Sequence, residues 1–229
     1  MAAVSREVAP GIVLVMADDQ VCNTWILVHE KSCFIVDMPP KADDGTTVPA
    51  ELVIQYIEDE DLSPVGLTVT HHHFEHVDGI ANFWDNLAES ETCRWICHDS
   101  LLQQVPRLKL FFDTVFHEPV FESNLSGEPL FLVHAPKHSL SDVLVIFRGT
   151  MITGDWWLGI GDPNLNHVRP EIAIESINRV FEVLRMKNYW VHRLFPSQKD
   201  AECLDLRYDQ DIEAVLKDTR EFYETTLTH

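Results

Sequence analysis

Compact apolar runs alternate with segments of helical spacing along most of the chain. The apolar runs, separated by turn residues, predict strands at residues 11–16, 24–29, 33–38, 65–70, 94–98, 130–134, 142–147, 150–153 and 189–195. Apolar residues at helical spacing predict helices that begin at Pro49 and Pro170, and further helices at 79–87, 99–105 and about 209–223. Strands in both halves with helices between them predict two sheets whose outer faces are covered by helices.

Nothing in the sequence divides the chain. It contains no internal repeat and no Pro/Gly/Ser linker, and its 45% apolar residues supply a sizeable core. Residues 1–229 are therefore expected to form a single domain. Residues 106–126 follow neither period, and their phenylalanines favour a loop or helix that covers an apolar site.

Charge and composition narrow the class of partner. The chain has 37 acidic and 17 basic residues, a net charge of −20, which disfavours binding to nucleic-acid phosphates or to an anionic membrane surface. No apolar run is long enough to span a membrane, and the first residues do not read as a secretory signal. Five cysteines, an odd number, favour free thiols in a reducing, cytoplasmic setting. A small-molecule substrate is expected, and the oligomeric state stays open, with a homodimer as one option.

The richest chemistry lies directly after the predicted strand at 65–70, where four histidines and a glutamate fall within six positions. In extended backbone, His71, His73 and Glu75 share one face, and His76 can turn back beside Glu75 at the start of the next helix. Imidazoles and a carboxylate at this spacing are typical metal ligands. A solvated histidine-rich loop has the same composition, but the apolar strand before it favours a structured metal site.

This segment resembles the His-x-His-x-Asp-His signature of the metallo-β-lactamase superfamily. His71, His73 and His76 match the three histidines, and Glu75 stands where the family has aspartate. Two later motifs occur in the family's order: residues 135–139 (Ala-Pro-Lys-His-Ser) resemble Pro-Gly-His-Thr, and residues 153–155 (Thr-Gly-Asp) resemble the Gly-Asp motif. The resemblance spans about residues 10–200 and implies a four-layer αββα sandwich of two mixed sheets with outer helices.

The resemblance also implies a set of metal ligands. A first ion would be held by His71, His73 and His138, with Asp155 bridging to a second ion held by Glu75, His76, Asp155 and one late ligand. Zinc is the expected metal, as one or two ions, with iron or manganese as alternatives. Gln198 occupies the place of the late histidine and is a poorer ligand, and Glu75 is one methylene longer than aspartate. The second site is therefore expected to be weak, altered or empty.

The implied activity is a metal-dependent hydrolysis. A metal-bound hydroxide would attack a lactone, a thioester or another ester, with Asp155 and Glu75 as catalytic groups and Glu75 orienting the hydroxide or transferring a proton. Trp156 and His167 are candidates for a substrate-binding wall. Two alternatives stay open. The first is a mononuclear iron dioxygenase acting on a thiol or persulfide through His71, His138 and Asp155, and the second is a non-catalytic member of the fold.

Overall fold

A computed structural model describes residues 4–16, 22–41, 48–87, 92–158, 168–197 and 212–227. The larger of its two sheets has seven strands in chain order: β1 (Val4–Ala9), β2 (Ile12–Met16), β3 (Thr24–His29), β4 (Ser32–Val36), β5 (Ser63–Thr68), β6 (Arg94–His98) and β7 (Thr114–Phe116). Strands β1 to β4 form an antiparallel meander, and the pairs from β4 to β7 are parallel.

The second sheet has five strands in the order β12 (Arg193–Pro196), β11 (Thr150–Gly154), β10 (Val143–Phe147), β9 (Glu128–His134) and β8 (Val120–Leu125). Its neighbours are antiparallel except for the parallel pair of β11 and β12. Both sheets are therefore mixed, as expected.

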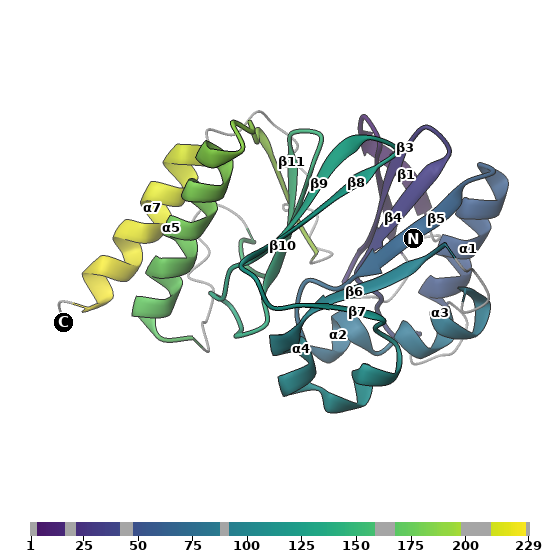
Figure 1. The fold of residues 1–229 in the computed structure, drawn as a ribbon, viewed down its shortest axis with the longest axis horizontal. Coiled ribbons are helices and arrows are strands. Elements are labelled where there is room, and N and C mark those ends of the chain that lie inside the picture. The colour runs from purple at the N-terminus through teal and green to yellow at the C-terminus, as the bar shows by residue number, and fades with distance from the viewer. Residues whose placement is uncertain are drawn as a thin grey trace.

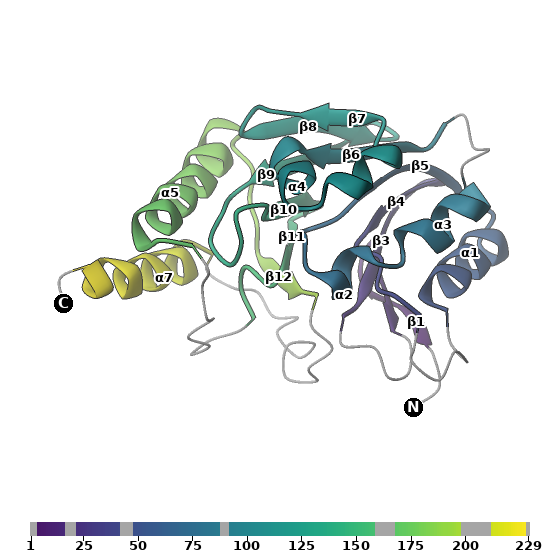
Figure 2. The same cartoon turned by 90° about the horizontal axis from the view of Figure 1, so that it is seen from below.

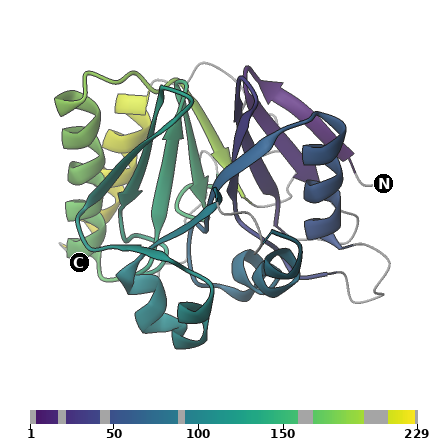
Figure 3. The ribbon, with the colours of Figure 1, turned by 45° about the vertical axis from the view of Figure 1, so that its right-hand side comes forward.

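Helices cover the two outer faces. Helices α1 (Pro49–Asp59) and α3 (Ile80–Leu87) flank the larger sheet, and α5 (Pro170–Met186) and α7 (Ile212–Leu227) flank the smaller one (Figures 1 and 3). Three short elements lie along one edge of the sandwich, the edge that faces the viewer in Figure 2: α2 (Phe74–Val77), α4 (Asp99–Gln104) and the 3-10 helix η1 (Pro106–Leu110). The predicted four-layer αββα sandwich is confirmed. Within the described ranges, no helix has the length and apolar character needed to cross a membrane.

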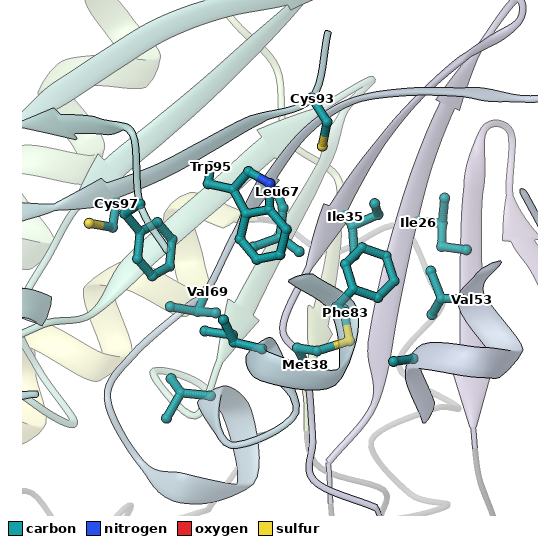
Figure 4. Close-up of a cluster of buried hydrophobic side chains, with 14 of the residues drawn as sticks. Ile26, Ile35, Met38, Val53, Leu67, Val69, Phe83, Cys93, Trp95 and Cys97 are labelled. Carbon is teal, nitrogen blue, oxygen red and sulfur yellow. The ribbon is translucent and has the colours of Figure 1, made fainter. Parts of the chain in front are cut away.

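Three apolar clusters hold the four layers together. Alternate strand residues meet between the sheets, where the rings of Trp25 and Phe195 stack with centroids 5.2 Å apart. The opposite strand faces pack on the helices, and Figure 4 shows Val53 of α1 and Phe83 of α3 directed against the larger sheet, where Phe83 lies 6.1 Å from the ring of Trp95. A third cluster fills the space between the smaller sheet and helices α5 and α7. The four layers form because each sheet is apolar on both faces and must be covered on both.

The structure differs from the sequence prediction mainly at sheet edges. Strand β1 was not predicted because Ser5, Arg6 and Glu7 are exposed and polar, as is usual for an edge strand. Residues 106–126, expected to be a loop or helix, contain η1 followed by β7 and β8, each at the edge of its sheet. Phe116 and Phe121 of these strands pack in the cluster between the sheets, which no local period reveals.

Candidate metal centre

Four chain segments that are distant in sequence meet at one edge of the sandwich. They are the residues after β5, the β9–β10 connection, the residues after β11 and the end of β12. Backbone hydrogen bonds join them: Val143 N donates to Thr70 O at 2.7 Å, and Ser197 N donates to Gly154 O at 3.1 Å. Gly154 has φ +56°, and a Cβ there would lie 2.4 Å from Thr70 Oγ1, so only glycine allows this approach. The contact brings Asp155 beside the histidines.

His71, His73, His138 and Asp155 form the first candidate ligand group. Their ligand atoms lie within 4.8 Å of one another. His73 Nδ1 is 3.0 Å from His71 Nε2 and 3.1 Å from His138 Nε2. A ring nitrogen offers one proton or one lone pair, so His73 Nδ1 cannot form two good hydrogen bonds to these neighbours. Three imidazole nitrogens aimed at one point fit a shared cation better than they fit one another.

The protonation state of this group suits a metal. Burial lowers the pKa of His71 well below its usual value, and the neighbouring histidines lower it further. Burial also lowers the pKa of His73, and His138 adds to that effect. Both rings are therefore neutral at pH 7, and neutral imidazole is the form that binds a metal.

Glu75, His76 and Asp155 form a second group whose ligand atoms also lie within 4.8 Å of one another. His76 Nε2 is 3.4 Å from Asp155 Oδ1. Burial alone would lower the pKa of His76, but the carboxylates of Asp37 and Asp155 outweigh it and raise this pKa well above the usual value. With the ring between two carboxylates, a proton or a cation at Nε2 is stabilised.

Asp37 anchors the ring of His76 from the opposite side. Asp37 Oδ2 lies 3.0 Å from His76 Nδ1, a contact of the kind that orients a metal-binding imidazole. The same carboxylate accepts hydrogen bonds from Thr70 N at 2.6 Å and from Ser197 Oγ at 2.6 Å. His76 Nε2 is thereby turned toward Asp155 and Glu75.

A third group of possible ligands, Cys22, Asp37 and His76, lies behind the centre. Burial raises the pKa of Cys22 to about 12, so its thiol is neutral at pH 7 and a poor ligand. Its Sγ lies 3.3 Å from His76 Nδ1. Because Asp37 already accepts hydrogen bonds from two other segments, this group supports His76 rather than holding an ion of its own.

Asp142 shapes the loop that carries His138. Its Oδ2 accepts hydrogen bonds from three consecutive backbone N–H groups, those of Lys137 (2.9 Å), His138 (2.6 Å) and Ser139 (2.9 Å). Its Oδ1 accepts a fourth from Ser139 Oγ at 2.6 Å. Asp142 was not among the predicted site residues. Its place directly before the apolar strand β10 was the signal in the sequence that could have identified it. The tight loop holds the His138 ring toward His73.

Comparisons with known proteins agree with this geometry. No protein-family model matches the chain. The hydroxyacylglutathione hydrolase of Vibrio campbellii (strain ATCC BAA-1116) is 23% identical over 164 residues, covering 69% of this chain and 56% of the relative. The chain spans about half the length of the curated relatives it matches.

Solved structures settle the fold. The DIM-1 metallo-β-lactamase exposed to ceftazidime superimposes with a TM-score of 0.72 at 15% identity, over 99% of this chain and 98% of that one. The chain therefore has the metallo-β-lactamase fold. A metallo-β-lactamase from Pontibacter korlensis superimposes with a TM-score of 0.70 at 11% identity, over 97% of this chain and 99% of that one.

Within this superfamily fold, the expected ligands come together, but the path of the backbone differs from the prediction. Strand β5 ends at Thr68, and Phe74 begins the short helix α2, so Glu75 is not on an extended face with His71 and His73. It lies on a helical turn beside His76, and its carboxylate still comes within 4.8 Å of the ligand atoms of His76 and Asp155. His72 points away as expected, with Nδ1 3.0 Å from Ser141 Oγ.

The remaining candidates of the sequence analysis fall into two groups. Trp156, expected to line a substrate wall, has no exposed surface, because it packs in the cluster under α5 and α7. The buried ring of Trp156 is therefore not a substrate-binding surface, contrary to the prediction. His167 and Gln198 lie outside the described residues. The backbone N–H of His192 donates to Gly149 O at 2.9 Å, at the opposite end of β11 from Asp155. His192 is therefore too remote to act as the late ligand.

Proposed function

We propose that the protein is a metal-dependent hydrolase that cleaves a thioester or a related ester of a small molecule. The observation that carries this proposal is the convergence of His71, His73 and His138 with Asp155 at the open edge of a metallo-β-lactamase fold. A structural role alone does not account for three imidazoles whose ring nitrogens point at one centre.

The donor set fits zinc, which prefers neutral imidazoles and carboxylates. His71, His73, His138 and Asp155 would hold such an ion, which would supply Lewis-acid activation of water and of the substrate carbonyl near neutral pH. This chain's own groups do the remaining work. Asp155 lies in both ligand groups and ties them together, and Glu75, half-buried beside His76, is placed to orient the attacking group or to give a proton to the leaving group.

Three features support an ester or thioester as the substrate. The sequence relatives are named hydroxyacylglutathione hydrolases, and that name denotes a thioester. Phe74 and Leu140 are 63% and 46% exposed, although each lies within two residues of a ligand, Phe74 beside His73 and Leu140 near His138. They provide exposed apolar surface close in sequence to the ligands for the acyl part or the leaving group. The net charge of −20 disfavours a phosphodiester polymer.

The test combines metal analysis with a substrate panel. Protein purified without added metal would be analysed for zinc, iron and manganese and then assayed with an acyl-glutathione thioester, an aryl ester, a lactone, a β-lactam and a phosphodiester. His71→Ala should lose metal and activity together. His72→Ala is the matched control, since His72 is adjacent in sequence but bonds to Ser141, and it should retain both.

The panel also separates the competing functions. Iron together with oxygen uptake on a thiol would favour the dioxygenase, whose ligands His71, His138 and Asp155 lie in the same cluster. His73 lies between those groups and takes a position that such a site would leave open. Absence of metal and of every activity in the wild-type protein would favour a non-catalytic member of the fold.

A further inference from the structure

Lys137 stands directly before His138, where the superfamily motif Pro-Gly-His-Thr has glycine. Its side chain does not extend into solvent, and only 2% of it is exposed. We propose that Lys137 is a positioning residue that holds His138 and Asp155 in the geometry of the first metal site and links that site to helix α7. The inference rests on the metal centre of the proposed function.

The side chain of Lys137 crosses from one ligand segment to the other. Its backbone N–H is held by Asp142 at 2.9 Å, and its Nζ donates to the carbonyl oxygen of Trp156, the residue that follows Asp155. His138 and Asp155 are thus each one residue from an end of this link. Their own atoms approach closely, with His138 Nε2 at 3.8 Å from Asp155 Oδ2.

Two aromatic rings enclose the ammonium group. Nζ lies 5.1 Å from the ring centre of Trp156 and 5.9 Å from that of Tyr223 on α7, and both rings are buried. Cations within about 6 Å of an aromatic face are attracted to it, and more strongly where water is excluded. Helix α7 thereby reaches, through Tyr223, the residue that precedes the candidate ligand His138.

The burial of this charge explains why the link is stiff. An ammonium group away from water is costly unless a hydrogen-bond acceptor or a polarisable face replaces its hydration. The Trp156 carbonyl and the two rings meet that need in one position of Nζ, so a displacement of either ligand segment would disturb those contacts. A functional site needs its ligands held within about 0.5 Å of the productive geometry, so a link that fixes both segments should support metal binding.

The experiment compares metal binding by the wild-type protein, Lys137→Met and Tyr223→Leu. Lys137→Met keeps most of the buried volume and removes the cation. Lys217→Met is the matched control. Lys217 lies on α7, the helix that carries Tyr223, and its exposed side chain pairs with Glu213 at 3.9 Å. Zinc affinity would be measured by competition with a chromophoric chelator, the cobalt-substituted proteins by their visible absorption, and the metal-free proteins by thermal unfolding.

Lys137→Met is expected to lower zinc affinity at the first site about 10- to 100-fold, the loss usual when a group that supports a ligand is removed. It should also change the visible spectrum of the cobalt-substituted protein. Tyr223→Leu should lower the affinity about two- to fivefold, as expected for one cation–π contact. Lys217→Met should leave affinity and spectrum unchanged. A merely structural lysine would alter the unfolding temperature of the metal-free protein without moving the cobalt spectrum.

A folded Lys137→Met variant with wild-type zinc affinity and cobalt spectrum would overturn the inference while the hydrolase proposal stands. If Lys137→Met does not fold, Tyr223→Leu decides, and wild-type binding by that variant overturns the inference. A wild-type protein that binds neither zinc nor cobalt at the histidine cluster overturns the proposed function and this inference together.

Discussion

Replacing Asp142 by alanine tests whether one carboxylate organises the His138 loop. Asp142 is 2% exposed and accepts hydrogen bonds from three successive backbone N–H groups and from Ser139 Oγ. Alanine leaves those three N–H donors without their acceptor in a buried loop. Asparagine keeps one acceptor oxygen for them, and Ser139 Oγ can rotate to accept from its amide.

The expected cost follows from these contacts. A hydrogen bond to a charged acceptor contributes about 1.5–3 kcal/mol, and stranding a buried donor costs about 1–3 kcal/mol. Three donors would give about 4–9 kcal/mol if their effects added, but a relaxed loop lets some of them reach water. Asp142→Ala should therefore lose about 3–5 kcal/mol of unfolding free energy, and Asp142→Asn about 1–2 kcal/mol.

The assay is urea unfolding of metal-free protein at pH 7, followed by tryptophan fluorescence and circular dichroism, with zinc content measured on parallel samples. Asp142→Ala should also lose zinc at the first site, because the His138 ring is no longer held toward His73. The reasoning would be refuted if Asp142→Ala unfolded within 1 kcal/mol of the wild-type protein. It would fail as well if asparagine proved as damaging as alanine, since charge rather than acceptor number would then dominate.

Three further predictions follow from single contacts. Asp37→Asn turns an amide N–H toward either Ser197 Oγ or His76 Nδ1. We therefore expect zinc affinity at the group of Glu75, His76 and Asp155 to fall about tenfold or more. An unchanged zinc titration would contradict the anchoring role of Asp37. Burial lowers the pKa of His134 to about 4, below the unfolded value of about 6.5, so its stabilising contribution is complete above pH 6.5 and declines by about 2–3 kcal/mol by pH 4.5. Metal-free His134→Phe, which keeps a ring against His98 at the 3.6 Å stack, should show a correspondingly smaller loss of stability between pH 7 and 4.5, and equal losses in the two proteins would disprove this. Phe74→Ala should raise KM for an apolar thioester roughly five- to tenfold with little change in kcat. The control is Met186→Ala, at an exposed position on α5, which should change neither constant. A fall in kcat alone would reject the role of Phe74 in binding.

Local pattern was sufficient for most elements and for the identity of the candidate ligands. The strands over 24–29 and 94–98 and the helix that begins at Pro49 have the predicted bounds or the predicted start, because apolar periodicity and proline geometry are local properties. The spacing of His71, His73 and His76 likewise pointed to a metal site without reference to distant residues. Edge strands β1, β7 and β8 escaped prediction, since their pairing depends on neighbours far along the chain.

Only the folded chain decides how the candidate ligands are held. Glu75 reaches His76 and Asp155 because α2 begins at Phe74, and that turn depends on contacts such as Met38 N to His76 O at 2.8 Å, made across 38 residues. Asp142 and Lys137 carry no motif for their supporting roles, which arise where the β9–β10 loop meets Trp156 after β11 and Tyr223 of α7. Hydrogen bonds and cation–π contacts act over a few ångströms in space, and the sequence separation of the partners contains no record of that proximity.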